Sequence, residues 1–276
     1  MNSKFEIINR IKTPSGRIRA AVFDFDGTIS TLRCGWEQVM GPLMLEYLSP
    51  GKEPSPALIE KVNRYIDEST GIQTVYQMQW LADEAEKETG IKRDAWFYKD
   101  EYNRRLMQSV EIKKQELKSN KISAENYLVG GSIDFLKSLK ERDISLFLAS
   151  GTDHKDVTQE AELLGAKPFF KEILGAPERK AVCSKEAVLK DLFEEKHFSG
   201  DELLVIGDGK VEIALAKQYG AFALGAATDE EKRKGLNPIK RKRLLKAGAD
   251  AITGDFLNAD EIFAWIDGYY KNIPRV

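Results

Sequence analysis

One stretch near the N-terminus constrains the fold more than any other. An apolar run without a charge, Ala20-Ala21-Val22-Phe23, leads directly into Asp24-Phe25-Asp26-Gly27-Thr28. The run predicts a β-strand over residues 20–25, and the glycine and hydroxyl at its end predict a sharp turn. In a regular strand Asp24 and Asp26 point the same way, whereas a turn at Gly27 splays them around one small site. Because two carboxylates this close repel each other, we expect a divalent cation or a retained proton between them.

The chain after Gly130-Gly131 alternates helical segments with short apolar strands. This alternation is typical of a parallel sheet with crossover helices. We expect strands at residues 144–149, 170–174, 203–206, 222–224 and 251–252. We expect helices at residues 132–140, 155–164, 185–195, 212–219, 238–247 and 259–270. Ser132 is expected to cap the first of these helices, and the basic helix at 238–247 is expected to be solvated.

Residues from about 31 to 126 differ in character, because their apolar residues recur at helical spacing and strand-like runs are few. Helices are expected at residues 36–48, 57–69, 74–89, 95–109 and 112–118. Trp36, Trp80 and Trp96 are candidate anchors for the core of a helical bundle. The segment is therefore predicted to be a helical insert between the first strand and the rest of the sheet.

The composition excludes some classes of partner. The 276 residues carry a formal net charge of -2, with acids and bases nearly balanced, so neither nucleic acid nor an anionic membrane is expected as a partner. Cys34 and Cys183 lie far apart and form no metal-type pair, which fits a reducing compartment. The N-terminal segment lacks the apolar core of a leader, and no later stretch reaches membrane-spanning length. We expect a soluble, cytoplasmic protein, and its oligomeric state stays open.

Polar residues follow several of the predicted strands at the points where those strands end. Besides the Asp24–Thr28 stretch, these are Ser150-Gly151-Thr152, which we expect to open a helix and to suit an anion, and Gly207-Asp208-Gly209, with Glu212 one helical turn onward. Lys185 stands at the start of another predicted helix. In open α/β sheets the carboxyl ends of the strands form the ligand site, so these residues are expected to converge. Singly each is ordinary, but together they supply acids for a metal, donors for phosphate oxygens and a fixed cation, as phosphoryl transfer requires.

This ordered set resembles the motifs of the haloacid dehalogenase-like superfamily, which are an Asp-x-Asp-x-Thr loop, a Ser or Thr after the second strand, a Lys and an acidic Gly-Asp loop. The resemblance covers residues from about 18 to 30 and from 128 to 270. It implies an α/β fold with a three-layer α/β/α, Rossmann-like parallel-sheet core made of residues 1–30 and 127–276. It also implies that residues 31–126 form an α-helical cap domain of the type inserted after the first motif.

The same resemblance implies a hydrolase of the phosphatase type that uses Mg²⁺ and acts on a small phosphorylated metabolite. Asp24 would attack phosphorus and form an aspartyl-phosphate, and Asp26 would protonate the leaving oxygen and later activate water. Mg²⁺ would be held by the Asp24 carboxylate, the Asp26 backbone carbonyl and Asp208. Ser150, the amides near Gly151 and Lys185 would cradle the phosphoryl oxygens.

Some roles stay open at this stage. Lys180 is a rival to Lys185 as the phosphate-binding lysine. Many relatives carry a second Asp where this chain has Glu212, whose longer side chain can still reach a metal-bound water. Thr28 and Gly209 are supporting candidates within the first and fourth motifs.

The start of the cap supplies the first candidates for substrate specificity, which are Arg33, Trp36 and Glu37, although Trp36 also suits packing. Of Arg104 and Arg105, at most one is expected to face the site, because adjacent helical residues point in different directions. A Ser150–His154 hydrolase is disfavoured, since the chain has two histidines and no Gly-x-Ser-x-Gly loop.

Other functions remain as alternatives to the phosphatase. A phosphomutase would use the same two acids and a similar cap. A non-catalytic scaffold that binds a phosphorylated ligand is the alternative from a different class. A dehalogenase is disfavoured, because that chemistry does without the second acid and the metal, whereas Asp26 is present.

Overall fold

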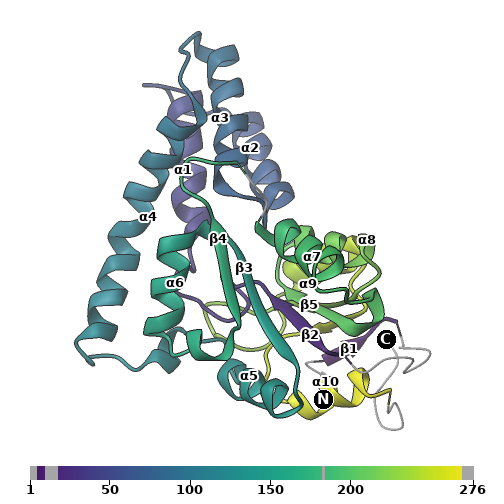
Figure 1. The fold of residues 1–276 in the computed structure, drawn as a ribbon. Coiled ribbons are helices and arrows are strands. Elements are labelled where there is room, and N and C mark those ends of the chain that lie inside the picture. The colour runs from purple at the N-terminus through teal and green to yellow at the C-terminus, as the bar shows by residue number, and fades with distance from the viewer. Residues whose placement is uncertain (1–4, 10–17, 182–183, 269–276) are drawn as a thin grey trace.

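The computed structural model describes residues 5–9, 18–181 and 184–268. Within them the chain forms one seven-stranded sheet with the strand order β1-β7-β6-β5-β2-β3-β4 (Figure 1). The strands are β1 Phe5–Ile7, β2 Ala20–Phe23, β3 Ser145–Asp153, β4 Glu172–Ala176, β5 Leu203–Gly207, β6 Phe222–Ala226 and β7 Ala251–Thr253. All neighbouring strands pair parallel except β1, which pairs antiparallel with β7. This strand order places β2 in the interior of the sheet, between β5 and β3.

Helices cover both faces of the sheet, which confirms the predicted three-layer α/β/α core (Figure 1). Helices α5 Ser132–Glu141, α6 His154–Leu163 and α10 Ala259–Ile266 contribute to the hydrophobic cluster on one face. Helices α7 Ser184–Glu194, α8 Lys210–Gln218 and α9 Pro238–Ala247 contribute to the cluster on the other. Short 3-10 turns lie at Ala124–Tyr127, Lys167–Phe169 and Gly200–Glu202.

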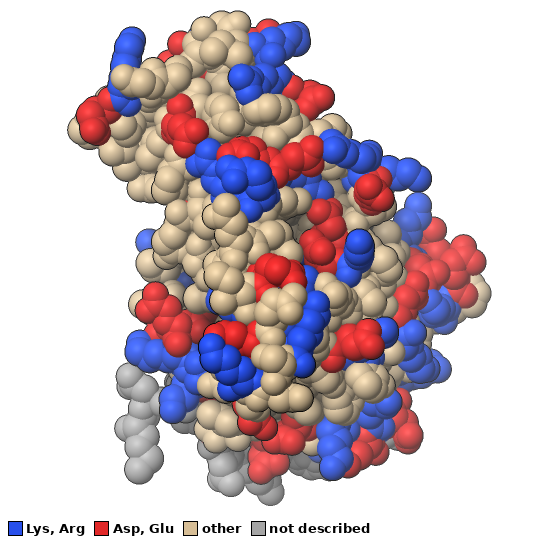
Figure 2. Space-filling view, turned by 90° about the vertical axis from the view of Figure 1, so that its left-hand side faces the viewer, with Lys and Arg blue, Asp and Glu red and all other residues tan. Residues whose placement is uncertain are grey.

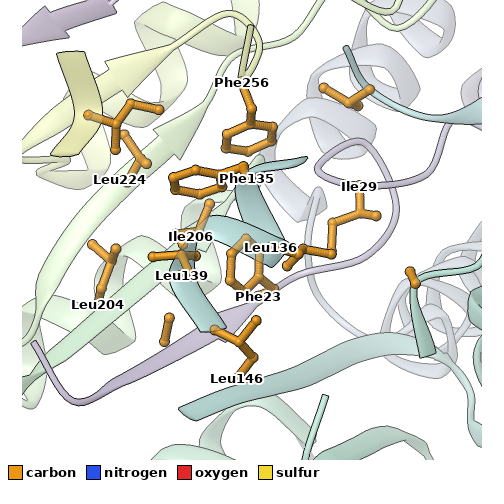
Figure 3. Packing of buried hydrophobic residues seen from close by; sticks show 14 of the residues in the cluster. Phe23, Ile29, Phe135, Leu136, Leu139, Leu146, Leu204, Ile206, Leu224 and Phe256 are labelled. Carbon is orange, nitrogen blue, oxygen red and sulfur yellow. The ribbon is translucent and has the colours of Figure 1, made fainter. Parts of the chain in front are cut away.

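Aromatic side chains fill the first of these clusters (Figure 3). Phe135 of α5 is fully buried, stacks on Phe256 with 4.8 Å between ring centroids, and meets the edge of Phe23 from β2. Burying an aromatic side chain stabilises a fold by roughly 1.5–3 kcal/mol. This packing therefore anchors β2 just before the chain reaches the two aspartates.

The insert forms four helices above the carboxyl end of the sheet (Figure 1). They are α1 Trp36–Leu48, α2 Pro56–Ser69, α3 Thr74–Thr89 and α4 Ala95–Lys118, and they share a hydrophobic cluster of their own. The predicted tryptophan anchors, Trp36, Trp80 and Trp96, pack against this cluster. The two connections to the sheet run side by side, because the Thr31 N–H donates to the Tyr127 carbonyl at 2.8 Å and Val129 N–H to the Ile29 carbonyl at 2.9 Å.

Three local predictions are wrong. The expected helices at 95–109 and 112–118 are one helix, α4, because no glycine or proline interrupts the chain between them. Ser132 does not cap α5; the N-cap is Gly131, in the left-handed conformation with φ 77, and Ser132 is the first helical residue. The Ser150-Gly151-Thr152 segment does not open a helix, since β3 continues to Asp153 through a shift of its register with β4.

Several smaller features lie outside the predictions. Strand β1, Phe5–Ile7, was not predicted, because a three-residue strand is too short for periodicity to show. The Cys34 thiol is partly buried, and burial raises its pKa to about 11. Cys183 lies outside the described residues. Figure 2 shows acidic and basic side chains intermixed over the face that it presents.

Candidate active site

The two aspartates of the first motif lie in a tight loop at the carboxyl end of β2. The Asp24 N–H still bonds the Ile206 carbonyl of β5 at 2.8 Å, so this residue is held as if the strand continued. The chain then turns sharply at Gly27, whose φ is 73. A Cβ on Gly27 would lie 2.9 Å from the Lys240 ammonium and closer still to the Asp208 carboxylate. Only glycine fits here, because the left-handed turn and the close approach both exclude a side chain.

Asp24 is a buried carboxylate with a partner on each oxygen. Its Oδ1 accepts from the Phe25 N–H at 2.8 Å, and its Oδ2 lies 3.0 Å from the Lys185 ammonium. Burial raises the pKa of Asp24 well above its ordinary value, and Lys185 opposes that rise. Asp24 faces the same pocket as Lys185, as the sequence predicts.

Lys185 stands between two carboxylates. Its ammonium lies 2.9 Å from Glu212 Oε2 as well as near Asp24, and it also donates to the Gly71 carbonyl of the insert at 3.4 Å. Burial disfavours the charged lysine, but the two acids outweigh burial and raise the pKa of Lys185. The rival Lys180 is exposed and does not line the pocket.

Glu212 and Asp208 complete a cluster of buried acids. Oxygens of Asp24, Asp208 and Glu212 all lie within 4.8 Å of one another, which is close enough to hold one metal ion. Glu212 also accepts from the Gly209 N–H at 2.5 Å and so caps α8, which begins at Lys210, two residues earlier than the predicted start. Carboxylate oxygens at this spacing suit a hard divalent cation such as Mg²⁺.

Helix α9 corrects the prediction of a solvated basic helix. Lys240 is only 7% exposed, and its ammonium lies 2.6 Å from Asp208 Oδ2 and 2.5 Å from Glu230 Oε1. Arg243 donates to the Asp208 backbone carbonyl at 3.2 Å. Burial alone would raise the pKa of Asp208, but Lys240 outweighs burial and the pKa is lowered. The basic run therefore supplies a counter-charge to the fourth motif.

Asp26 lies against the end of β3. Its Oδ2 accepts from the Thr152 hydroxyl at 2.8 Å and from the Ser150 hydroxyl at 3.5 Å. Its buried Oδ1 has no hydrogen bond with any described residue and lies 3.8 Å from Arg33 Nε. Burial raises the pKa of Asp26 to about 6, although Arg33 acts in the opposite direction.

Arg33 is fixed by helix α6 rather than free to meet a ligand. Its guanidinium makes a bidentate pair with the fully buried Glu160, at 2.7 and 3.1 Å, and lies 3.6 Å from Asp156. A bidentate pair between a carboxylate and a planar guanidinium belongs to the strongest class of charged hydrogen bonds. This pair could not be predicted from local sequence, because the partners lie 127 residues apart.

One pocket contains most of these side chains. It is lined by Asp24, Asp26, Gly27, Arg33, Trp36, Thr70, Gly71, Ile72, Thr74, Gln77, Tyr102, Leu106, Ser150, Gly151, Thr152, Lys185, Asp208 and Glu230. Glu212 stands just behind it, in contact with Lys185. Thr28 is fully buried, and its hydroxyl has no hydrogen-bond partner in the part of the chain that the structure describes. Of the three specificity candidates, Arg33 and Trp36 line the pocket, whereas Glu37 is exposed and does not.

The insert supplies a wall of the pocket that the sequence could not assign. Residues 70–73, between α2 and α3, reach down to the core, with Gly71 near Lys185 and Ile72 near Gly151. Gln77, Tyr102 and Leu106 join them. The Thr70-Gly71 dipeptide is recognisable in the sequence as a turn, but nothing local indicates that the turn contacts Lys185, which lies 114 residues further along the chain.

Comparison with known proteins agrees with this arrangement. The model of the haloacid dehalogenase-like hydrolase family matches residues 18–220. No curated protein sequence matches significantly. No helix among the described residues has the length and apolar character needed to cross a membrane.

Several solved structures share the fold at low sequence identity. A predicted phosphatase from Clostridium acetobutylicum is 18% identical over 90% of this chain and 97% of its own, with a TM-score of 0.57. A predicted phosphoglycolate phosphatase from Haemophilus somnus is 17% identical over 90% and 99%, with a TM-score of 0.60. A β-phosphoglucomutase from Clostridium difficile is 16% identical over 91% and 98%, with a TM-score of 0.60.

Proposed function

The chain belongs to the haloacid dehalogenase-like hydrolase family, and from this premise we propose that it is a Mg²⁺-dependent phosphatase acting on a small phosphorylated metabolite. The observation that carries the proposal is the single pocket in which Asp24 and Asp26 meet Lys185 and Asp208. Two acids with different surroundings, a buried cation and a third acid are what hydrolysis through an aspartyl-phosphate requires.

The acids fit a magnesium ion by the chemistry of their oxygens. We propose that the Asp24 and Asp208 carboxylates and the Asp26 backbone carbonyl hold it, with Glu212 at hand for a metal-bound water. When bound, Mg²⁺ offsets the negative charge of the acids and of the phosphate dianion. Lys185 and Lys240 already offset part of the negative charge of the acids. A bound divalent cation would offset more of it.

The proposed reaction has two steps, and Asp24 and Asp26 divide the work. In the first, an Asp24 oxygen forms a bond to phosphorus, the bond from phosphorus to the ester oxygen breaks, and Asp26 gives its proton to the departing oxygen. In the second, Asp26 takes a proton from water as that water attacks phosphorus, and orthophosphate leaves Asp24 as a free carboxylate. The raised pKa of Asp26, about 6, supports its role as the group that carries the proton.

The remaining site residues would position the phosphoryl group. We propose that the Ser150 hydroxyl, the Gly151 amide and Lys185 bind its oxygens, with Thr152 holding Asp26 in place. As part of the same proposal, residues 1–30 and 127–276 form the catalytic core. Residues 31–126 form a cap that closes the pocket and excludes water.

Release of orthophosphate from a panel of phosphate monoesters, with and without Mg²⁺, tests the proposal. We expect Mg²⁺-dependent release, and a loss of at least about a thousandfold in Asp24→Asn, because the amide cannot act as the nucleophile. The control is Asp83→Asn, the same change at an exposed position of α3. Full activity in Asp24→Asn would remove Asp24 as nucleophile.

Two outcomes would favour the alternatives. Conversion of a sugar phosphate into its isomer without orthophosphate would indicate a phosphomutase. Ligand-induced stabilisation with no turnover of any ester would indicate a non-catalytic scaffold.

A further inference from the structure

The part of the pocket beyond the acids is poor in available positive charge. Among the described residues that line it, the cations are Lys185 and Arg33. Lys185 is held by Asp24 and Glu212, and Arg33 by Glu160. Neither is free to receive a second anion in addition to the phosphate.

The cap does not supply a cation from its own helices. Along α4, Lys99 pairs with Asp153 at 2.5 Å, Arg104 with Glu101 at 2.7 Å, and Arg105 with Glu46 at 2.8 Å. None of the three lines the pocket. The neutral residues Thr74, Gln77, Tyr102 and Leu106 stand in their place.

The acids in the pocket make a second anion still less favourable. Glu230 lines the wall in addition to Asp24, Asp26 and Asp208, and its one strong partner is the buried Lys240, which it shares with Asp208. A carboxylate on the leaving group of a substrate would enter this partly enclosed space, and no cation among the residues that line it is available to pair with that charge. Burying a charge without a partner is strongly unfavourable.

The neutral wall offers contacts of a different kind. Trp36, Ile72 and Leu106 supply aromatic and apolar surface. Tyr102 is 4% exposed, lines the same pocket, and its hydroxyl makes no hydrogen bond with any described residue. A buried tyrosine hydroxyl ordinarily finds a partner, so this one is available to a ligand.

Resting on the proposed phosphatase activity, we propose that the enzyme takes monoesters whose leaving group is an uncharged alcohol or phenol with an apolar face. The apolar face packs on Trp36, Ile72 and Leu106, and a hydrogen-bonding group on the leaving group meets the Tyr102 hydroxyl. Esters that carry a carboxylate or second phosphate on the leaving group are rejected, because no cation awaits that charge.

A matched pair of substrates tests the charge rule. The two esters are para-carbamoylphenyl phosphate and para-carboxyphenyl phosphate, which have nearly the same shape and differ in one negative charge. We expect kcat/KM to favour the carbamoyl ester by at least about tenfold, because its amide needs no counter-ion. Equal values, or a preference for the carboxyl ester, would overturn the proposal.

Two variants locate the rule in the pocket. Tyr102→Phe should lower kcat/KM for the carbamoyl ester by about three- to tenfold relative to kcat/KM for phenyl phosphate, which has no such group. Thr74→Arg should raise the carboxyl ester relative to the carbamoyl ester by at least about tenfold. Gln79→Arg, which adds the same charge to an exposed position of α3, should leave the ratio unchanged. An equal effect of both arginine variants would contradict a pocket origin.

Binding separates this proposal from the activity on which it rests. If no phosphate monoester of the panel is hydrolysed with Mg²⁺, the phosphatase proposal fails, and calorimetric titration of the carbamoyl and carboxyl esters still measures the preference. Tighter binding of the carbamoyl ester would support the neutral subsite. Equal or weaker binding would overturn it, whether or not turnover occurs.

Discussion

At the scale of single residues, the site is a set of buried acids that are kept compact by buried cations. Lys185 forms ion pairs with Asp24 and Glu212. Lys240 pairs with Asp208 and Glu230, and Arg33 pairs with Glu160. Removing one partner from a buried ion pair leaves an uncompensated charge and is costly. Each cation is therefore a site where a substitution has a predictable effect on stability.

Lys240→Gln tests this for the least expected of the three. Without the ammonium, Asp208 and Glu230 repel each other in a buried space, so we expect the free energy of unfolding of the metal-free protein to fall by about 3 kcal/mol. Because Mg²⁺ then replaces the missing charge, it should stabilise Lys240→Gln more than the native protein, as measured by chemical denaturation with EDTA and with Mg²⁺. Lys242→Gln, the same change at an exposed position of α9, should have little effect on either. Equal Mg²⁺ stabilisation of both variants would contradict this account.

The protonation of Asp26 gives a second prediction at this scale. Burial raises its pKa from the ordinary 3.8 to about 6, so the folded protein holds this proton more tightly than the unfolded chain. This contribution to stability is complete below the ordinary value and is lost as the pH rises through about 6. One quarter of the side chain stays exposed, which screens the effect.

Asp26→Asn removes that titration. Between about pH 4 and pH 8, in EDTA, the native protein should lose on the order of 1 kcal/mol of unfolding free energy relative to the variant, because the amide has no charge to bury. Denaturation curves at a series of pH values measure the difference. A difference that grows in the opposite direction would mean that the folded protein stabilises the ionised carboxylate instead.

The site residues that could be predicted from the sequence are those whose neighbours along the chain indicate their position. Asp24, Asp26 and Asp208 each follow an apolar strand, so their common location could be predicted from strand ends alone. Lys240 could not, because its basic neighbours resemble a solvated surface, and its partner Asp208 is 32 residues distant. Tyr102 could not be predicted as a site residue either, because it lies on the apolar face of helix α4 and resembles a core residue.

At the scale of elements, helix α6 is tied to the start of the insert. Glu160 lies on the buried face of α6, and its bidentate pair with Arg33 joins that helix to the loop that leaves the sheet. This contact holds the end of β3 near Asp26, because α6 begins directly after β3. Long-range pairs such as this one decide how elements are placed relative to one another, and they cannot be read from the local sequence.

Glu160→Gln should weaken this link. The amide leaves the buried guanidinium of Arg33 without its main counter-charge, so we expect a loss of about 3–5 kcal/mol in the free energy of unfolding. Glu162→Gln is the matched control, because Glu162 lies on the same helix with an exposed pair to Lys167 at 2.9 Å. Exposed pairs of this kind contribute about 0–1 kcal/mol, so the control should be nearly neutral. Similar losses in both variants would show that Arg33 does not depend on Glu160.

Element boundaries were predicted well where breakers or apolar runs mark them and less well elsewhere. The basic helix at 238–247 matches α9 at both ends, with Asn237 capping its first turn and Gly248 ending it. Strand β3 runs four residues past its predicted end, since Ser150-Gly151-Thr152 has the composition of a helix start but forms an irregularity between Ala149 and Asp153, which both pair with β4. Tertiary pairing overrode the local preference there.

At the scale of the whole molecule, the pocket exists only where the insert meets the sheet. The loop between α2 and α3 reaches the core at Gly71, which has φ 91 and whose carbonyl lies 3.4 Å from the Lys185 ammonium. A Cβ on Gly71 would lie 3.3 Å from both the Gly209 Cα and the Glu212 carboxylate, which is tighter than ordinary packing. The insert and core can therefore be separated by a substitution that harms neither hydrophobic cluster.

Gly71→Ala is that substitution. The added methyl group presses on the α8 cap, so we expect the insert to dock less closely and kcat/KM for a phosphate ester to fall by about tenfold or more. The free energy of unfolding should fall by only about 1–2 kcal/mol, which is the cost of a left-handed alanine. Gly90→Ala is the control, because Gly90 has φ 73 in the same insert with nothing within 4 Å of its Cβ position. It should lose the same stability and keep full activity. If both variants lose activity equally, backbone strain alone accounts for the effect, and the contact between Gly71 and the core does not control closure.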